Sequence, residues 1–179
     1  ADQAWLAENC SKILHCAGVV KFQADGKSGE PYLTNVDGTR ALIEVGRRCN
    51  VKEFHYVSTA YTCGDSTGPV SEDHHDVGQQ FHNDYERSKF LAEGLLRQET
   101  CFDRIAIYRP SVVLGDANTG FTLTFGGGYN LLALGWHLAT QQVDADSLFR
   151  SVDLGSHDII NLVTADWVSK VMLQLLDRP

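Results

Sequence analysis

Apolar and polar positions along the chain fall into two alternating patterns. Short apolar runs typical of buried strands occur at 12–17, 51–58 and 104–108. Apolar residues spaced three and four apart, typical of amphipathic helices, occur at 5–9, 34–49, 84–100, 131–142 and 165–176. A further extended stretch is predicted at 158–163. Strands that alternate with helices in this way predict an α/β fold with a parallel sheet.

The two central helices indicate which of their faces should be buried. The helix at 34–49 carries an apolar stripe formed by Val36, Leu42, Ile43 and Val45. The helix at 84–100 begins at Asp84, a suitable N-cap residue. Its residues expected to face the core are Phe90, Leu91 and Leu95. Each helix therefore offers one apolar face to the sheet.

Polar or glycine-rich loops separate these elements, at 21–32, 62–83 and 119–129. The first loop contains Gly26-Lys27-Ser28, but a phosphate-binding P-loop needs a glycine five positions before Gly26, and Lys21 stands there. The second contains His74 and His75, whose adjacent side chains do not converge on one ion and have no third ligand at a diagnostic spacing. We therefore expect neither a P-loop nor a metal site.

Composition places the chain among globular proteins and excludes several classes of partner. Its 179 residues fit one domain, and a hydrophobic content of 43% is enough for a core. A formal net charge of -8 argues against a general nucleic-acid or anionic-membrane binder. No apolar run is long enough to span a bilayer. Five cysteines without framework spacing indicate reduced thiols in a cytoplasmic protein. We therefore expect a single domain over residues 1–179.

The segment Tyr85-Glu86-Arg87-Ser88-Lys89 carries the clearest candidate chemistry. On a helix, Tyr85 and Lys89 lie four residues apart and share one face. A phenol has a pKa near ~10, and a nearby ammonium lowers it. With the hydroxyl of Thr59 holding a substrate carbonyl, these residues make a proton donor for hydride transfer to that carbonyl. The spacing alone favours a half-buried Tyr beside a solvated Lys, and the order of the surrounding stretches is what favours the catalytic interpretation.

Five stretches occur in an order that points to one family. They are His15-Cys16-Ala17-Gly18, Asn35-Val36-Asp37-Gly38-Thr39, Tyr56-Val57-Ser58-Thr59-Ala60, Tyr85-x-x-x-Lys89 and Arg109-Pro110-Ser111-Val112-Val113. Together they resemble the extended short-chain dehydrogenase/reductase family. The stretches at 57–61, 109–116 and 162–168 are similar to its thioester reductase and fatty acyl-CoA reductase branch, the male sterility type. Sugar epimerases, dehydratases and hydroxysteroid or flavonoid reductases share most of these stretches.

The resemblance assigns roles to individual residues. Thr59 would hydrogen-bond the carbonyl, Tyr85 would donate the proton, and Lys89 would lower the Tyr85 pKa and hold the nicotinamide ribose. The cofactor-binding set that the resemblance implies is Ala17, Gly18, Asn35, Tyr85, Lys89, Tyr108, Pro110 and Val113. Asn35 would fix the strand and the helix around the site, and a helix N-cap is a second role open to it.

The resemblance also implies a fold. This is a doubly wound, parallel-sheet Rossmann-like domain in which residues 119–160 form an excursion on the substrate side. The family's opening strand, glycine-rich turn and helix hold the cofactor pyrophosphate, and nothing in the chain matches them. We therefore expect the N-terminal part of the domain to be missing from the chain. In the strand order 3-2-1-4-5-6, the strand at 12–17 would be the fourth.

The implied activity is reduction of a thioester or aldehyde carbonyl, with NADP(H) as cofactor and NAD(H) as the alternative. The implied substrate is a small molecule or a carrier-bound acyl group, and a homodimer is an option. Two rival functions stay open: a sugar-nucleotide epimerase or dehydratase that uses the same residues, and a non-catalytic dinucleotide-binding protein. An intact set of Thr59, Tyr85 and Lys89 argues against the second rival, because a sensor does not need all three.

Overall fold

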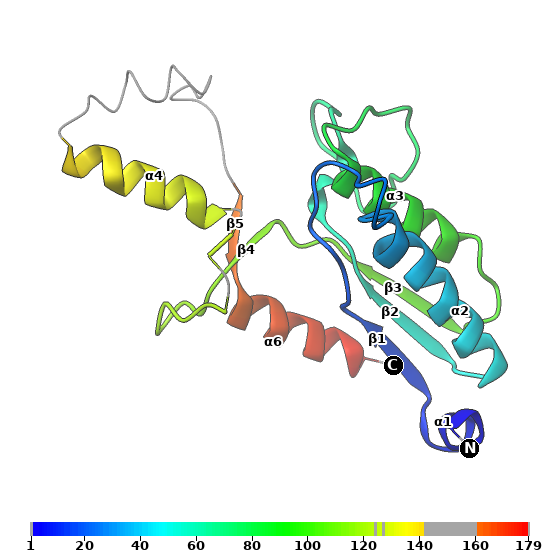
Figure 1. The fold of residues 1–179 in the computed structure, drawn as a ribbon. Helices are drawn as coiled ribbons and strands as arrows, with labels where there is room; N and C mark the ends of the chain where they lie inside the picture. The colour runs from blue at the N-terminus through cyan, green and yellow to red at the C-terminus, as the bar shows by residue number, and fades with distance from the viewer. Residues whose placement is uncertain (1, 124, 127, 142–160, 179) are drawn as a thin grey trace. The chain divides into compact units, whose positions relative to one another are not determined.

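The computed structural model describes residues 2–123, 125–126, 128–141 and 161–178 (Figure 1). The chain divides into two compact units, residues 1–110 and 111–179, and each is described by itself. Both units contain parallel strands with helices, as the alternating sequence pattern predicts.

The first unit is built on a three-stranded parallel sheet of order β1-β2-β3. Its strands are β1 (Lys12–His15), β2 (Glu53–Val57) and β3 (Arg104–Tyr108). The bounds of β3 agree with the prediction, while β1 and β2 are shorter than the apolar runs that predicted them. The register pairs His15 with Tyr56 and Val57 with Tyr108. The carboxyl ends of all three strands therefore meet at one edge of the sheet.

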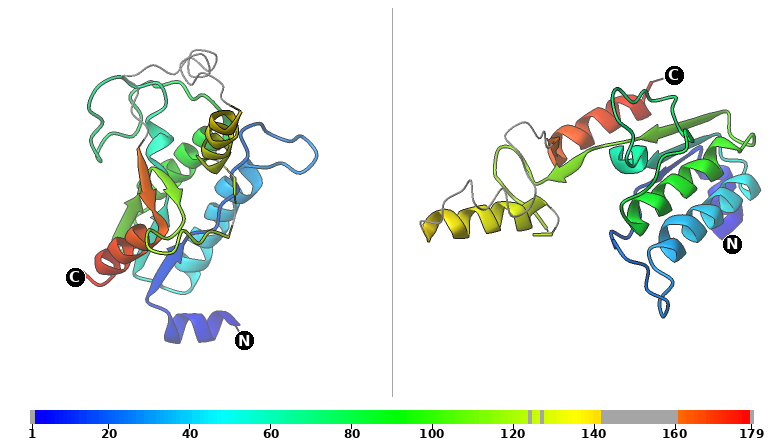
Figure 2. Two further views of the ribbon diagram at one scale, coloured as in Figure 1. Left: turned by 90° about the vertical axis from the view of Figure 1, so that its left-hand side faces the viewer. Right: turned by 90° about the horizontal axis from the view of Figure 1, so that it is seen from above.

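Helices α2 (Thr39–Arg48) and α3 (Asp84–Arg97) lie side by side on one face of this sheet (Figures 1 and 2). The unit also contains α1 (Asp2–Asn9) and the 3₁₀ turn η2 (Ala60–Cys63). The predicted single helix at 34–49 is wrong in its first part, where a π-helical turn, η1 (Leu33–Gly38), precedes α2. Such wider turns often accompany functional sites, and this one carries Asn35, which is fully buried.

Two details predicted for α3 are wrong. The N-cap is Asn83, whose side chain accepts a hydrogen bond from the Glu86 N–H at 2.9 Å. Asp84 occupies the first turn, and its carboxylate accepts hydrogen bonds from the Ala24 N–H and the Tyr32 hydroxyl. Leu91 is 40% exposed. Leu91 therefore lies away from the core, while other positions on α3 face it.

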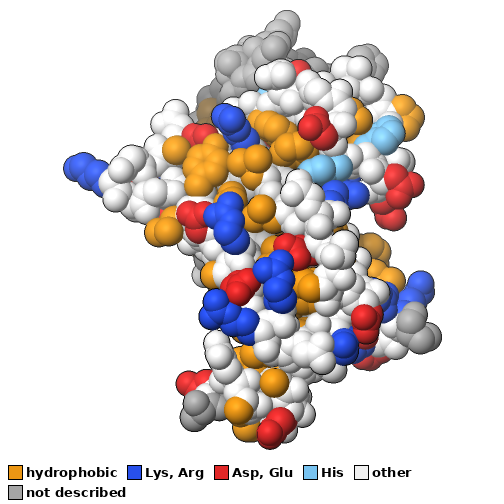
Figure 3. Space-filling model, turned by 90° about the vertical axis from the view of Figure 1, so that its right-hand side faces the viewer, with side chains coloured by type: hydrophobic (Ala, Val, Ile, Leu, Met, Phe, Trp, Pro, Cys, Tyr) orange, Lys and Arg blue, Asp and Glu red, His pale blue; other side chains and the backbone are white. Residues whose placement is uncertain are grey.

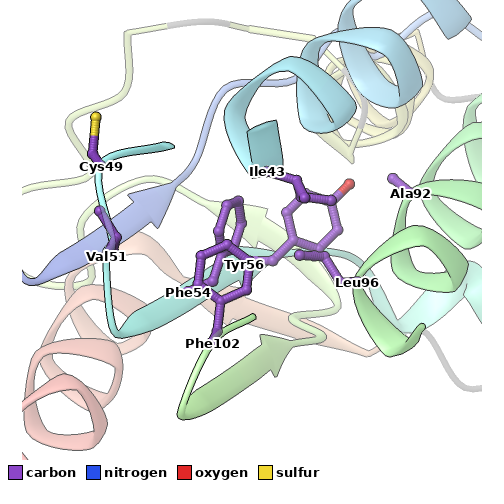
Figure 4. Packing of buried hydrophobic residues seen from close by; sticks show 8 residues of the cluster. All are labelled: Ile43, Cys49, Val51, Phe54, Tyr56, Ala92, Leu96 and Phe102. Carbon is purple, nitrogen blue, oxygen red and sulfur yellow. The ribbon is translucent and has the colours of Figure 1, made fainter. Parts of the chain in front are cut away.

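The core lies between the sheet and these two helices (Figure 4). Because side chains alternate across a strand, Phe54 and Tyr56 of β2 both point to this side. The fully or largely buried residues of the cluster are Ile43, Cys49, Val51, Phe54, Tyr56, Ala92, Leu96 and Phe102. A Cβ at Gly46 would lie 2.8 Å from the Phe102 ring, so the absence of a side chain there lets α2 approach the core.

The outer face of α2 carries exposed ion pairs. Arg48 pairs with Glu44 at 2.8 Å, and Arg47 pairs with Glu99 at 2.8 Å. Figure 3 shows acidic and basic side chains interspersed on this side of the molecule. Exposed pairs of this kind contribute little to stability, so the buried face of α2 is what holds it in place.

The second unit contains a two-stranded parallel sheet of β4 (Val112–Leu114) and β5 (Leu162–Thr164). Its helices are α4 (Gly128–Thr140) and α6 (Ala165–Leu176). The bounds of α6 agree with the prediction, and α4 starts three residues earlier than predicted. Residues 158–160 of the predicted extended stretch, and much of the predicted excursion at 119–160, lie outside the described residues. Among the helices that the structure describes, none could cross a bilayer.

Candidate active site

Thr59 and Tyr85 come together at the carboxyl edge of the first sheet. Thr59 follows β2 and caps η2, with its hydroxyl accepting a hydrogen bond from the Tyr61 N–H at 3.3 Å. Tyr85 lies in the first turn of α3, close enough to Thr59 for the Thr59 side chain to favour its phenolate. Thr59 is only 5% exposed. Two hydroxyls from separate elements therefore meet, as a carbonyl-binding pair requires.

Lys89 lies one helical turn after Tyr85 and is 4% exposed. Its ammonium donates a hydrogen bond to the Val57 carbonyl at 2.6 Å and lies 4.2 Å from the centre of the Tyr56 ring. Burial lowers the pKa of Lys89 to about 8, and the charges of Glu93 and Cys16 oppose this shift. The ammonium thus lies on the same helix as Tyr85 and is only weakly solvated.

The phenol of Tyr85 has a raised pKa, because burial disfavours the phenolate, and the neighbouring Thr59 side chain opposes that effect. The predicted lowering of this pKa by Lys89 is not seen in this geometry. Lys89 does not lower the Tyr85 pKa because its ammonium points to the Val57 carbonyl and the Tyr56 ring instead of to the phenol. A phenol with a raised pKa stays protonated at neutral pH, which suits a proton donor.

Asn35 ties the loop after β1 to α3. Its side-chain oxygen accepts from the Val19 N–H at 2.8 Å, and its amide donates to the Val19 carbonyl at 3.0 Å and to Ser88 at 2.8 Å. The Ser88 hydroxyl in turn donates to the Tyr85 carbonyl at 2.8 Å. Asn35 lies inside η1 and not at a helix N-cap. It therefore holds strand and helix together, which is the first of its two expected roles.

Ala17 and Gly18 lie in this loop and are exposed. A Cβ on Gly18 would lie 3.4 Å from the Asn35 side-chain oxygen and 3.8 Å from the Lys89 ammonium. A side chain at Gly18 would therefore reach the surroundings of both Asn35 and Lys89. These residues fit a cofactor that approaches the backbone closely.

The other expected cofactor residues, Tyr108, Pro110 and Val113, do not lie in the loop after β1. The Tyr108 and Pro110 carbonyls accept hydrogen bonds from the Ser58 and Ala60 N–H groups at 2.7 and 2.9 Å. These bonds extend the β2–β3 pairing past the strands and hold Thr59 between them. The Tyr108 hydroxyl bonds to His55 at 2.7 Å, on the sheet face opposite to Tyr56. Val113 lies on β4 in the second unit.

Sequence reasoning missed a buried ion pair next to this site. Glu93 on α3 is fully buried, and Arg109 donates to its carboxylate at 3.0 and 2.6 Å. Arg109 also donates to the His74 carbonyl at 3.0 Å, which holds the long loop at 62–83. The four-residue spacing of Lys89 and Glu93 on α3 was a usable signal, because it puts both charges on one helix face.

The chain is similar to curated proteins that include a reductase and an epimerase. A family model described as male sterility protein matches residues 1–172. UDP-glucose 4-epimerase uge1 of Schizosaccharomyces pombe is 30% identical over 55% of this chain and 29% of its own length. Fatty acyl-CoA reductase wat of Drosophila melanogaster is 26% identical over 63% of this chain and 26% of its own length. The chain thus spans less than a third of either relative.

Solved structures show the same fold. The terminal R domain from the myxalamid PKS-NRPS biosynthetic pathway has a TM-score of 0.77 and 25% identity, over 99% of this chain and 42% of that chain. UDP-glucuronic acid 4-epimerase from Bacillus cereus, in complex with UDP-glucuronic acid and NAD, has a TM-score of 0.52 and 26% identity. That match covers 64% of this chain and 37% of the epimerase. The described architecture is therefore part of a Rossmann-like α/β domain.

Proposed function

Because the chain belongs to the male sterility protein family, we propose that it carries the catalytic residues of an NAD(P)H-dependent reductase. The proposed reaction is hydride transfer to the carbonyl carbon of a thioester or an aldehyde. The observation that carries this proposal is that the buried Thr59, at the end of β2, lies close to Tyr85, with the buried Lys89 one helical turn further along α3. The fatty acyl-CoA reductase and the terminal R domain among its relatives favour a reductase.

In the proposed mechanism, Thr59 and Tyr85 bind the substrate carbonyl oxygen between their hydroxyls. The bound dinucleotide supplies the hydride. As negative charge develops on the oxygen, the Tyr85 phenol transfers its proton there. Lys89, one helical turn after Tyr85 on the same face of α3, would hold the cofactor ribose next to the reacting groups.

The cofactor would lie along the loop after β1. Ala17 and Gly18 leave room for it, Asn35 holds the loop, and Lys89 would hydrogen-bond its ribose. Pro110 would border the nicotinamide, together with the backbone of Tyr108. We propose NADP(H) as the cofactor and keep NAD(H) as the alternative, since the epimerase relative from Bacillus cereus is a complex with NAD.

The proposed substrate is an acyl group, free or carried by another protein domain. The terminal R domain that resembles this chain belongs to a PKS-NRPS biosynthetic pathway, which supports a carrier-bound acyl group. The rival function is that of a sugar-nucleotide epimerase, which the similarity to two such enzymes favours. A reducing, cytoplasmic setting is supported by the five cysteines, which are all free thiols.

Product analysis separates the reductase from the epimerase. The full-length protein is incubated with NADPH or NADH and a long-chain acyl thioester, and in parallel with NAD and a nucleotide sugar. We expect oxidation of the reduced cofactor and release of an aldehyde or alcohol, detected by mass spectrometry. An epimerised sugar with no reduction of the thioester would establish the rival instead.

The proton donor is tested by Tyr85→Phe. We expect turnover to fall by about 10²–10⁴-fold, because the general acid is lost, while the dissociation constant of the cofactor changes little. Tyr61→Phe is the matched control, since Tyr61 lies next to the site but is 41% exposed. Normal turnover in Tyr85→Phe would contradict the mechanism.

The carbonyl-binding role of Thr59 is tested by two variants of opposite character. Thr59→Ser keeps the hydroxyl and should retain much of the activity. Thr59→Val keeps the shape and should lose most of the activity, because the hydrogen bond to the substrate carbonyl disappears. A role in packing alone predicts the reverse order, and steady-state kinetics distinguishes the two.

A further inference from the structure

Lys89 is a buried cation whose closest neighbours are a carbonyl and an aromatic ring. Its ammonium donates to the Val57 carbonyl at 2.6 Å and lies 4.2 Å from the centre of the Tyr56 ring. Among the residues that the structure describes, no carboxylate forms a salt bridge with Lys89. A single carbonyl satisfies one of the three ammonium N–H donors. The ring therefore makes up a large part of the charge-stabilising surroundings.

The Tyr56 ring is held rigidly in the position that Lys89 uses. Tyr56 is fully buried near the end of β2 and packs among Ile43, Ala92 and Leu96 (Figure 4). The His15 ring lies against it, with 5.3 Å between the two ring centroids. Packing from both helices and from β1 leaves the ring little freedom to turn. Its face is thus a fixed feature of the site.

The attraction comes from the face of a neutral ring. Burial raises the pKa of the Tyr56 phenol, so that no phenolate forms there at neutral pH. The face of a neutral aromatic ring carries partial negative charge, and a cation within about 6 Å of the ring centre is attracted to it. The attraction is stronger where water is excluded, and Lys89 is 4% exposed.

We propose that Tyr56 is a positioning residue for the reaction, whose ring face holds the Lys89 ammonium charged and in place beside Tyr85. This role rests on the proposed function, in which Lys89 must be a cation. Phe54, two residues earlier, points to the same core but packs against His15 and Phe102. Phe54 therefore shares the burial of Tyr56 without its contact to Lys89.

The titratable groups around Lys89 leave the Tyr56 ring an important role in keeping the ammonium charged. At the end of β1, His15 and Cys16 face it, and on α3 it is flanked by Tyr85 and Glu93. Glu93 favours the charged form of Lys89, but its carboxylate is already engaged by Arg109. His15 offers no negative charge. Beside the Val57 carbonyl, the ring face thus favours the cation without being neutralised by another residue.

The test measures the titration of Lys89 directly in the full-length protein. Lysine labelled with ¹³C at Cε is followed by NMR against pH, and Lys89→Met identifies the Lys89 signal. Phenylalanine analogues with one, two and three ring fluorines at position 56 weaken the ring face stepwise at almost constant shape. Tyr56→Phe begins the series, and Phe54→Leu and Tyr56→Leu are compared as matched core variants.

We expect Tyr56→Phe to leave the midpoint of Lys89 within experimental error of the parent protein. Increasing fluorination should lower the midpoint progressively, by roughly 0.5–1 pH unit for the trifluorinated ring, and Tyr56→Leu should lower it as well. Phe54→Leu should leave it unchanged. A midpoint that does not follow fluorination, or that falls equally in Phe54→Leu, would overturn the proposal.

The alkaline limb of the kcat/KM profile should move down in pH together with the NMR midpoint. The NMR titration of Lys89 does not depend on turnover, so it tests the role of Tyr56 even if no reductase activity is found. Absence of thioester reduction by the parent protein would overturn the proposed function alone. If the protein reduces the thioester but the titration midpoint of Lys89 does not change with the fluorination of the ring, only the role of Tyr56 would be overturned.

Discussion

Lys89 and Arg109 are two cations removed from water in the same unit, and their surroundings differ in kind. Arg109 donates two hydrogen bonds to the Glu93 carboxylate and a third to a backbone carbonyl. Lys89 has a carbonyl and a ring face. Glu93 follows Lys89 by one helical turn, yet its carboxylate is directed to Arg109. The Glu93 carboxylate therefore pairs with the Arg109 guanidinium, whose planar arrangement of donors matches its two oxygens.

The difference shows how one fold can hold one cation in a permanent ion pair and leave another able to change its charge. The hydrogen bonds with Glu93 raise the pKa of Arg109, which remains a cation under all ordinary conditions. Burial lowers the pKa of Lys89 to about 8, so a small change in its neighbours alters its charge near neutral pH. A perturbed pKa of this kind is more typical of functional groups than of structural ones.

The largest expected effect is on turnover in Lys89→Met, which keeps the aliphatic stem and removes the charge. We expect turnover to fall by about 10²–10⁴-fold and cofactor binding to weaken, because Lys89 is proposed to hold the ribose. The free energy of unfolding should fall by no more than about 1 kcal/mol, since a costly buried cation is removed. Kinetics and urea denaturation of the same preparation measure both quantities. A stable Lys89→Met variant with normal turnover would contradict the functional role that distinguishes Lys89 from Arg109.

The opposite outcome is expected for Arg109→Met. Removing the guanidinium takes both short hydrogen bonds from the buried Glu93 and leaves it only the longer contacts with Arg97 at 3.9 Å and His75 at 3.6 Å, which should lower the free energy of unfolding by about 3–5 kcal/mol. Turnover per folded molecule should change far less than in Lys89→Met. Urea denaturation and an active-site titration measure the two effects.

Two further variants sharpen this result. Combining Arg109→Met with Glu93→Leu removes both charges and should restore most of the lost stability. Arg48→Met breaks an exposed ion pair of similar length with Glu44 and should leave the urea midpoint unchanged within error. If the double variant is no more stable than Arg109→Met, the buried charge of Glu93 is not the cause.

A smaller effect is expected from His15, the third basic group near Lys89. Burial, and next the charge of Lys89, lower the pKa of His15 to about 4. Its ring nitrogen bonds to the Thr39 hydroxyl at 2.9 Å, and that hydroxyl donates to the Asn35 carbonyl. The Thr39 oxygen is thus left as an acceptor, so His15 must donate its single proton to it.

Because the folded-state pKa of His15 is depressed, its contribution to stability is fully present above about pH 6.5 and is lost as pH falls toward about 4. The loss amounts to about 2–3 kcal/mol. Comparing urea denaturation of the parent protein and His15→Gln between these pH values isolates it. His137→Gln, at an exposed position, should follow the parent. Parallel curves for parent and His15→Gln would contradict the assignment.

The sequence predicted the elements of the fold more reliably than their local details. The family, the parallel α/β architecture and the bounds of β3 and α6 are confirmed, because apolar periodicity depends mainly on burial. The π turn η1 escaped prediction because it keeps a helical pattern while the Asn35 side chain reaches out of it. The cap of α3 shifted by one residue, since Asn83 and Asp84 are both good caps and tertiary contacts with Ala24 and Tyr32 engage Asp84.

For the site, spacing placed Tyr85 and Lys89 on one helix and could not give the direction of the ammonium. That direction depends on the Val57 carbonyl and the Tyr56 ring, which come from a strand some thirty residues earlier. The pairing of Glu93 with Arg109 likewise joins two elements. The residue roles assigned from the resemblance stay predictions, and the variants described here test them.

The three hydrogen bonds of Asn35 have a consequence for motion. Residues 16–20 have no regular secondary structure, and such a segment would normally open independently of the core. Here both backbone groups of Val19 are bonded to a side chain that is fully buried and anchored to α3 through Ser88. To release the loop, the chain must break bonds inside its core. The loop therefore opens together with α3, so a coil segment has the local stability of the helix that carries Tyr85.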